Sequence, residues 1–254
     1  MTKNNIAIVE DESDFLENKP QSLFLIAWRQ IRKSRMARVG FFVLVALILV
    51  AIFAGQIAPY DPYETNYSNF KQPPSAEHLL GTDQIGRDNL SRLIHGSRMS
   101  LIIGLVVAAI AVTIGVPLGA IAGYFGGLAD MLIMRVVDIL MAFPFILLAI
   151  GMVAVIGPGL INMMIALGIV SWIWFTRLVR GMVLSMRESD FILAARAAGA
   201  SPARIIFRHL LPNVTGVVVV QASFTVAEAI LAAAALSYLG LGVQPPTAEW
   251  GGML

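Results

Sequence analysis

The stretch SDFILAARAAGASPARIIFRHLLP, from Ser189 to Pro212, decides how the second half of the chain is organised. It is the longest polar-containing segment between two apolar runs in that half. We predict that it forms two short helices with a break at Gly199, which fits the left-handed position that ends a helix. Ser189 or Asp190 is expected to cap the first helix, because short polar side chains accept hydrogen bonds from free backbone amides. Four alanines favour that helix strongly: Ala194, Ala195, Ala197 and Ala198.

The second predicted helix begins just after the glycine. Ser201 is expected to cap it, with Pro202 at the first helical position, where a missing N–H is harmless. Pro212 is expected to close it, because a proline interrupts the hydrogen bonds of a helix interior. Small residues let a partner approach closely, and basic side chains offer polar contacts at Arg196, Arg204 and Arg208. The stretch is therefore either a docking site or a plain connector at a membrane surface.

Composition points to a membrane protein. The chain has 254 residues, of which 57% are hydrophobic and 13% are charged. A soluble globular protein carries about 25% charged residues, so we expect a polytopic, all-α helical bundle with one membrane domain. The absence of cysteine excludes disulfides, thiolate chemistry and cysteine-bound metal. A net charge of +2 is too small and too dispersed to suggest nucleic acid as a partner.

The first part of the chain is expected to lie outside the membrane. Residues 1–20 are polar and acidic, which favours disorder, and the first long apolar run begins only near residue 39, which excludes a signal peptide. In residues 22–38, apolar and basic side chains alternate at roughly helical spacing. This pattern fits a helix on the membrane surface, and equally the basic flank that orients the first span. We therefore assign 1–38 to a tail with an interfacial helix and 39–254 to the transmembrane domain.

Five apolar runs are long enough to cross a membrane, which requires about 20 residues. They are 39–58, 99–123, 137–157, 160–177 and 214–242. Of the 18 lysines and arginines, seven precede the first run, one lies between the second and third, and six lie between the fourth and fifth. These 14 share one side, which the positive-inside rule makes cytoplasmic. The N-terminus and a 178–213 loop are thus predicted to be cytoplasmic, and a 59–98 loop extracytoplasmic.

Glycines and prolines in the second and third predicted spans indicate how these spans pack and bend. Gly115, Gly119 and Gly123 recur every four residues, which leaves a groove for close packing against another helix. We favour core packing over a pore lining for this groove. Pro117 and Pro144 are expected to bend their spans and to give the bundle places to hinge.

Ionisable residues inside apolar runs are candidates for function, because they are unfavourable in lipid. Arg135 and Asp138 are three residues apart and are expected to pair on one helix face. Glu228 lies in the middle of the fifth span, with Gln221 nearby. Its position is compatible with a pore lining along a translocation path and with a hydrogen bond between helices.

The stretch from Ser189 to Pro212 resembles a known family motif. It is similar to the "EAA" loop of ABC-transporter permease subunits, which has the pattern E-A-A-x3-G-x9-I-x-L-P. Five positions match, Ala194, Ala195, Gly199, Leu211 and Pro212, whereas Leu193 replaces the glutamate and His209 the isoleucine. The ending FRHLLPN resembles the peptide/nickel branch. In that family the loop sits in a cleft of a separate ATPase subunit. The resemblance implies a coupling role for Asp190, Ala194, Ala195, Arg196, Gly199, Ser201, Pro202, Arg204 and Pro212.

A second resemblance covers LGTDQIGRDNLSRLIHGSRMSLIIG, which is similar to the segment before the second span in C-type subunits of dipeptide, oligopeptide and nickel permeases. The match is carried by Gly81, Thr82, Asp83, Gly86, Arg87 and Asp88. Thr82 and Asp83 could cap a short helix, and Arg87 could pair with a carboxylate of the loop or of a partner. A structural cap over a pore mouth and direct contact with substrate both remain open.

The end of the chain resembles the same family. AILAAAALSYLGLG is similar to AIL-x-E-x-x-LS-[FY]-LGLG, with Ala233 at the usual glutamate. The family's fold has a sixth span after this point. Five spans would place the C-terminus outside, and we favour a truncated permease over a departure from the family fold.

The resemblance implies the C-type permease subunit of an ABC importer in the bacterial inner membrane, with its N-terminus cytoplasmic. It would translocate dipeptides or oligopeptides by alternating access. The implied partners are a homologous second permease, two ATPase subunits that bind ATP and magnesium, and an extracytoplasmic solute-binding protein. The chain has no G-x-x-x-x-G-K-[ST] loop, and we expect no cofactor, no metal and no catalysis in it. A nickel-chelate or antimicrobial-peptide importer, a membrane-embedded enzyme and a non-transporting scaffold stay as alternatives.

Overall fold

The computed structural model describes residues 32–253, and within this range it is helical, with one isolated β-bridge between Thr82 and Asp88. The chain divides into two units, residues 1–49 and 50–254, and each is described by itself. The predicted acidic tail and most of the predicted interfacial helix fall outside the described residues. Four helices are long and apolar enough to cross a membrane, and a bent pair of helices makes a possible fifth span.

The first apolar run forms α2 (Arg35–Ile52), which is apolar on almost all sides. Its 18 residues extend over about 27 Å at 1.5 Å per residue, close to the thickness of the hydrocarbon layer. The predicted span 39–58 is interrupted, because α2 ends at Ile52 and a short separate helix, α3 (Ala54–Ile57), follows in the second unit.

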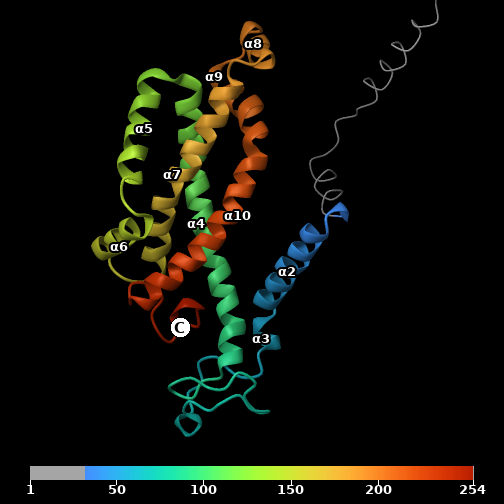
Figure 1. Cartoon of the computed structure of the whole chain (residues 1–254), viewed down its shortest axis with the longest axis vertical. Helices are drawn as coiled ribbons and strands as arrows, with labels where there is room; N and C mark the ends of the chain where they lie inside the picture. Colours follow the sequence, from blue (N-terminus) through green and yellow to red (C-terminus); the bar gives the residue numbers. More distant parts are fainter. Residues whose placement is uncertain (1–31, 254) are drawn as a thin grey trace, which may run out of the picture. The chain divides into compact units, whose positions relative to one another are not determined.

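Three long helices form the core of the second unit: α4 (Asn89–Phe125), α7 (Leu160–Met186) and α10 (Leu211–Tyr238). Figure 1 shows α7 running beside α4, with α10 crossing them. The predicted spans 99–123 and 160–177 are parts of longer helices. Helix α4 begins ten residues earlier, inside the stretch predicted as a loop, and α7 extends nine residues further, into the predicted cytoplasmic loop.

The glycine groove of α4 packs against α7, as predicted. A β-carbon on Gly115 would lie 2.5 Å from the Trp172 carbonyl oxygen, and one on Gly119 would lie 2.6 Å from that of Thr176. The Thr176 hydroxyl also donates a hydrogen bond of 3.1 Å to the Gly115 carbonyl oxygen across the two helices. Only glycine permits such close approach of two backbones, so the groove fixes the α4–α7 pair.

The predicted span 137–157 is bent at Pro144, as expected, and the bend is sharp enough to divide it into two helices. The chain forms α5 (Gly127–Met141) and α6 (Phe145–Ile156), whose axes are bent by 93°. Pro144 lies at the start of α6, where it lacks an N–H for the preceding helix and disfavours helical backbone in the residue before it. In Figure 1, α5 runs beside α7 and α6 turns across it.

The predicted pair of Arg135 with Asp138 is also wrong. Asp138 instead accepts a hydrogen bond of 2.8 Å from Arg177 of α7. One further ion pair, between Asp130 and Arg180, joins the same two helices. Because α5 lies against α7, the acidic residues of α5 pair with arginines of α7 rather than with an arginine of their own helix.

The prediction that Pro212 closes a helix is wrong as well. The chain is helical without a break from α9 (Pro202–Ile205), through one π-helical turn (Ile206–Leu210), into α10. Leu211 donates its amide hydrogen to Ile206, five residues back. The wider π-turn removes the usual four-residue hydrogen bonding just before the proline, so Pro212 is accommodated in the first turn of α10.

Candidate functional site

Two regions carry the sequence motifs, and they lie at opposite ends of the second unit (Figure 1). We call residues 187–201 the connector; it contains α8 (Asp190–Ala197). We call residues 58–88 the α3–α4 loop. The predicted 178–213 loop also includes the end of α7, and the predicted 59–98 loop includes the first ten residues of α4.

The connector turns sharply at Gly199, as predicted. Gly199 has φ of +79°, and its amide donates to the Arg196 carbonyl oxygen at 3.0 Å. The Ala200 amide donates to the Ala195 carbonyl oxygen, also at 3.0 Å. These two bonds are the Schellman pattern that ends a helix and needs a left-handed residue. The direction of the chain between α8 and α9 is thus set by backbone hydrogen bonds around one glycine.

The two predicted caps behave differently. The Ser201 hydroxyl accepts a hydrogen bond of 3.4 Å from the Arg204 amide, with Pro202 at the first position of α9, as predicted. Ser189 occupies the cap position of α8, but its hydroxyl donates to the Met186 carbonyl oxygen and caps no amide. Ser189 therefore satisfies the end of α7 rather than the start of α8.

Two isoleucines anchor the connector to the bundle. Ile192 of α8 and Ile205 of α9 are both fully buried, in a cluster that includes Val179, Val183 and Leu210. Their transfer out of water contributes about 2 kcal/mol each. The sequence analysis did not single out either residue. Their burial beside exposed alanines was detectable only as a weak amphipathic pattern over a helix of eight residues.

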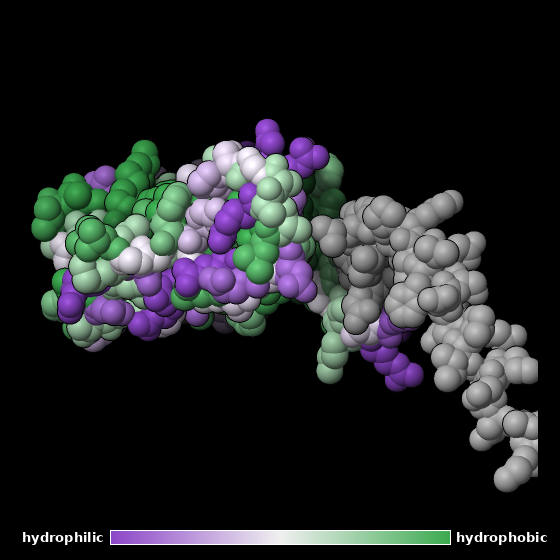
Figure 2. Space-filling view, turned by 90° about the horizontal axis from the view of Figure 1, so that it is seen from above, coloured by the Kyte–Doolittle hydropathy of each residue, from purple (hydrophilic) through white to green (hydrophobic). Residues whose placement is uncertain are grey.

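The rest of the connector faces outward. Phe191 is 46% exposed and Leu193 is 42% exposed. Of the nine residues predicted to couple, Ala195 is half-buried and the other eight are exposed: Asp190, Ala194, Arg196, Gly199, Ser201, Pro202, Arg204 and Pro212. The Arg196 guanidinium lies 5.9 Å from the centre of the Tyr124 ring, at the end of α4. Seen from this end, hydrophilic and hydrophobic surfaces lie next to each other (Figure 2).

The α3–α4 loop is built around two glycines of the second motif. Gly81 and Gly86 have φ of +68° and +77°. A β-carbon on Gly86 would lie 1.8 Å from the Asn66 carbonyl oxygen, and one on Gly81 would lie 2.3 Å from that of Gln72. Neither position accepts a side chain, because both the backbone angle and the space forbid it.

The polar motif residues hold the loop to itself. The prediction that Thr82 and Asp83 cap a helix is wrong. The Thr82 hydroxyl accepts from the Gln72 amide at 2.8 Å and donates to the Asn69 carbonyl oxygen. Asp83 accepts from the amides of Ile85 and Arg87, and it pairs with the Arg87 side chain at 2.6 Å, which confirms a carboxylate partner for Arg87 within the loop.

Asp88 is the residue that caps α4. Its carboxylate accepts from the Ser91 amide at 2.8 Å and the Ser91 hydroxyl at 2.7 Å, and from Nδ1 of the His78 ring at 3.0 Å. Burial opposes ionisation of Asp88, but these hydrogen bonds outweigh it and hold its pKa below the ordinary value of 3.8. The pKa of Asp83 is lowered in the same way. Burial opposes its ionisation, but hydrogen bonds from Arg87 and Ile85 outweigh this effect.

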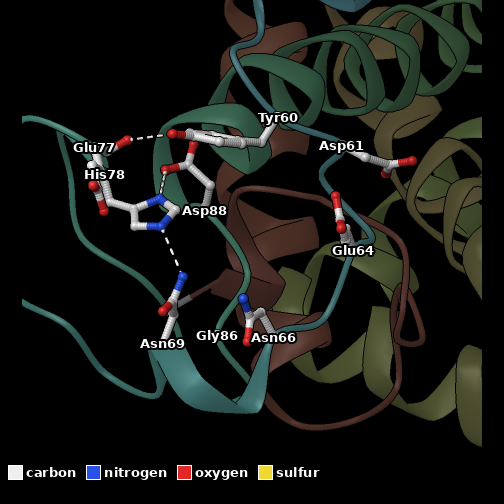
Figure 3. A pocket seen from close by; sticks show the side chains of 9 residues that line it. All are labelled: Tyr60, Asp61, Glu64, Asn66, Asn69, Glu77, His78, Gly86 and Asp88. Atoms are coloured by element: carbon white, nitrogen blue, oxygen red, sulfur yellow. Dashed lines mark hydrogen bonds and ion pairs between the residues drawn. The ribbon is translucent and has the colours of Figure 1, made fainter.

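A hollow of about 260 Å³ opens beside the His78–Asp88 pair (Figure 3). Its wall includes Tyr60, whose ring centre is 5.0 Å from that of His78. The Tyr60 hydroxyl donates to the Glu77 carbonyl oxygen at 2.8 Å, and Asn69 contacts the other ring nitrogen of His78 at 3.2 Å. Both ring nitrogens of His78 and both carboxylate oxygens of Asp88 thus have partners among the loop and the first turn of α4.

The two residues predicted to line a path lie on α10. Gln221 is half-buried and Glu228 is exposed on the surface of this chain. Among residues 32–253, Glu228 has no hydrogen-bond or ion-pair partner, so the alternative of a hydrogen bond between helices is not formed within the chain. In the same range, no three His, Asp or Glu side chains converge as metal ligands.

The arrangement defines a class of protein: a multi-pass membrane subunit with an anchored, outward-facing connector at one end. Residues 115–254 match the family model "Binding-protein-dependent transport system inner membrane component". Residues 22–74 match "N-terminal TM domain of oligopeptide transport permease C". The chain belongs to this family and is the permease subunit of an ABC importer in the inner membrane.

Individual relatives agree with the family. The chain is 50% identical over 228 residues to the dipeptide transport system permease protein of Alkalihalophilus pseudofirmus, covering 90% of this chain and 75% of that one. It is 40% identical over 242 residues to the oligopeptide transport system permease protein of Bacillus subtilis, covering 95% and 79%. It is 46% identical over 228 residues to the glutathione transport system permease protein of Escherichia coli, covering 89% and 75%.

Solved structures support the fold. The chain is similar to a chain of the MetNI methionine ABC transporter in an inward-facing conformation, with a TM-score of 0.52 and 25% identity. The similarity covers 60% of this chain and 76% of that one. The expected helical fold of an ABC importer permease is thereby confirmed.

Proposed function

We propose that the chain is the permease of a peptide importer, and that its connector receives the motion of ATPase subunits. The curated relatives at 40 to 50% identity are named as transporters of dipeptides, oligopeptides and glutathione, which is itself a short peptide. The substrate class that these names share is a short peptide, which we assign to this chain.

The continuity of α9 with α10 carries the proposal. The connector turns at Gly199, enters α9 at Ser201, and then runs through the π-turn into α10 without a break. A force on α8 is therefore delivered to a helix of the membrane bundle rather than absorbed by a loose loop. The exposed Phe191 and Leu193 supply an apolar surface for the partner that applies this force.

The proposed assembly has a second homologous permease, two cytoplasmic ATPase subunits that hold ATP and magnesium, and an extracytoplasmic solute-binding protein. The positive charge near the connector and before the first span supports a cytoplasmic position for the connector and the N-terminus, by the positive-inside rule. Closure of the ATPases would move α8 and α10 and open the bundle to the other side. Glu228, exposed and without a partner among the described residues, would face the path between the two permeases, with Gln221 beside it.

The test is peptide uptake in cells that express the whole transporter, with the membrane level of the chain measured in parallel. Gly199→Val should abolish uptake while the chain stays inserted, because a β-branched residue is strained at a φ of +79°. Gly181→Val is the matched control, since both positions have open space for a side chain and Gly181 lacks a positive φ. Gly199→Asn should keep uptake, because asparagine tolerates the left-handed region.

Two results would contradict the proposal. Unchanged uptake with Gly199→Val would remove the connector from the coupling path. Uptake of a nickel chelate in place of a labelled dipeptide would show that the substrate class is wrong while leaving the coupling role intact.

A further inference from the structure

Arg92 is a buried arginine that lies within the second quoted segment but is not among the six residues that carry its match. It lies in the first turn of α4, and its side chain is 6% exposed. Its Nη1 atom donates to the Pro62 carbonyl oxygen at 3.2 Å and to the Pro246 carbonyl oxygen at 3.4 Å. Its Nε atom lies 3.8 Å from the Asp83 carboxylate. One guanidinium therefore contacts two parts of the α3–α4 loop and the segment around Pro246, which is 154 residues away in the sequence.

The segment on the far side of this contact, residues 244–253, is attached to both α4 and α10. The Trp250 indole donates to the Leu93 carbonyl oxygen at 3.0 Å, and its ring covers Gly96. Gly251 lies directly on Ala234 of α10, where a β-carbon would be 2.1 Å from the Ala234 Cα. The buried Glu249 carboxylate accepts from the amides of Gly251 and Gly252, at 2.9 Å each, and keeps this segment folded.

We propose that Arg92 is a positioning residue for transport. It makes the α3–α4 loop, the first turns of α4 and residues 244–253 one rigid unit, so that the loop-side ends of α4 and α10 keep a fixed separation during the cycle. The rearrangement that opens and closes the path is then confined to other places in the bundle, such as the bend between α5 and α6 and the connector.

The planar fork of arginine is what the contact requires. A guanidinium presents several N–H groups in fixed directions and so reaches carbonyl oxygens on two segments and a carboxylate at once, which an ammonium group on a lysine cannot do. Both carbonyl oxygens belong to prolines, Pro62 and Pro246. Removal of Arg92 takes the donor away from both acceptors and frees residues 244–253 from this contact with α4.

A disulfide can replace the contact after the protein has folded. The chain has no cysteine of its own, so a pair introduced at residues 96 and 250 meets no other thiol within this chain. The Trp250 amide nitrogen lies 3.5 Å from the position of a β-carbon on residue 96, which brings the two side chains within disulfide reach. The same membranes, oxidised or reduced, then serve as their own control.

The experiment measures peptide uptake per inserted molecule of the complete transporter, and it rests on the proposed function for its substrate. Arg92→Gln should lower uptake by about tenfold or more at an unchanged membrane level, the factor expected for losing a hydrogen bond from a charged group. Arg92→Lys should give an intermediate loss. Arg98→Gln, an exposed arginine on the same helix, should have no effect. When Gly96→Cys and Trp250→Cys are introduced into the Arg92→Gln chain, oxidation of the two cysteines to a disulfide should restore uptake.

Three results would overturn the proposal. If oxidation blocks uptake in the chain that retains Arg92, the ends of α4 and α10 must separate during transport. If the disulfide forms but does not restore uptake by the Arg92→Gln chain, the role of the arginine is not to hold these segments together. If the disulfide fails to form in an inserted chain, residues 244–253 do not dock on α4. If the unchanged transporter takes up no peptide, the substrate assigned above is wrong. Stimulation of the ATPase activity of the same complex would then be measured in place of uptake.

Discussion

The connector and the α3–α4 loop both carry family motifs, but the motif residues are placed in opposite ways. In the loop, none of the six is exposed: Gly81, Thr82, Asp83, Gly86, Arg87 and Asp88 are buried or half-buried. Of the nine residues predicted to couple, six lie in the connector and three just after it, and eight of the nine are exposed. A motif whose side chains bond to one another maintains a shape, whereas a motif whose side chains face outward is available to something outside the chain. The loop motif is thus explained by the fold, whereas most side chains of the connector motif remain available for contacts outside the chain.

Two glycines make the contrast quantitative. Gly86 and Gly199 have nearly the same backbone, with φ of +77° and +79°. A β-carbon on Gly86 would overlap the Asn66 backbone, whereas one on Gly199 would meet nothing within 4 Å. Substitutions in the loop should therefore destabilise the protein, and substitutions in the connector should impair transport with little loss of stability.

The largest effect on stability is expected for Gly86→Ala. Strain and overlap together should lower the free energy of unfolding by about 3 kcal/mol. Gly199→Ala should lower it by only about 1 kcal/mol, because the backbone strain acts alone. Thermal unfolding of the purified complex would measure both. Gly55→Ala in α3, which has open space and no positive φ, is the control and should be neutral or slightly stabilising. Equal losses at the two positive-φ glycines would contradict the packing described for the loop.

A smaller loss is expected when Asp88 is altered. Asp88→Ala should destabilise the loop by about 2 kcal/mol, because α4 loses its cap and the buried His78 loses its partner. Protease digestion of the loop at neutral pH would report it. An asparagine side chain at this position would still cap the helix, so Asp88→Asn should lose less.

The same residue predicts how the loop responds to acid. The folded pKa values of Asp88 and Asp83 lie below the ordinary value of 3.8. A carboxylate with a lowered pKa contributes stability above its unfolded pKa, and this contribution is lost as pH falls through the folded pKa. Protection of the loop from an acid-active protease should therefore persist down to about pH 4 and fall below it, and Asp88→Asn should flatten this dependence. If protection is lost already near neutral pH, the acid response belongs to a group other than Asp88 and Asp83.

Features set by one or two neighbouring residues could be predicted from the sequence. Gly199 at the end of α8, Ser201 and Pro202 at the start of α9, and the spaced glycines of α4 all follow from local backbone chemistry or from a regular repeat. These features position the connector and join α4 to α7. The number of apolar runs was likewise sufficient to predict an all-α membrane bundle.

Features set by distant partners could not be predicted in this way. Arg135 and Asp138 have suitable spacing on α5, but the position of α7 offers Asp138 a better partner in Arg177. Pro212 would end an ordinary helix, and only the π-turn before it allows the helix to continue. Thr82 bonds to residues ten and thirteen positions away, which sequence spacing does not reveal.

In the connector, Ser201→Ala should have a modest effect. The cap bond is long, at 3.4 Å, so its loss should lower stability by about 0.5 kcal/mol, at the low end for helix caps. Uptake should fall only slightly, because Pro202 and the hydrogen bonds at Gly199 still set the turn. Ser185→Ala on α7 is the control, since its hydroxyl donates to the nearby Met182 carbonyl oxygen and caps no amide. A large loss of uptake would show that Ser201 contacts a partner directly.

A large effect on assembly is expected for Phe191→Ser combined with Leu193→Ser. Each side chain is slightly more than half buried within this chain, so the free energy of unfolding should also fall, by about 1 kcal/mol for each substitution. If these side chains form the apolar surface that an ATPase subunit contacts, the complex purified from membranes should lose that subunit, because apolar anchors at the centre of an interface carry much of its affinity. Leu128→Ser, at the exposed start of α5, should leave the complex intact. Retention of the ATPase by the double variant would assign the outward face of α8 to lipid or solvent, and the comparison with the loop would then rest on Arg196 and Arg204 alone.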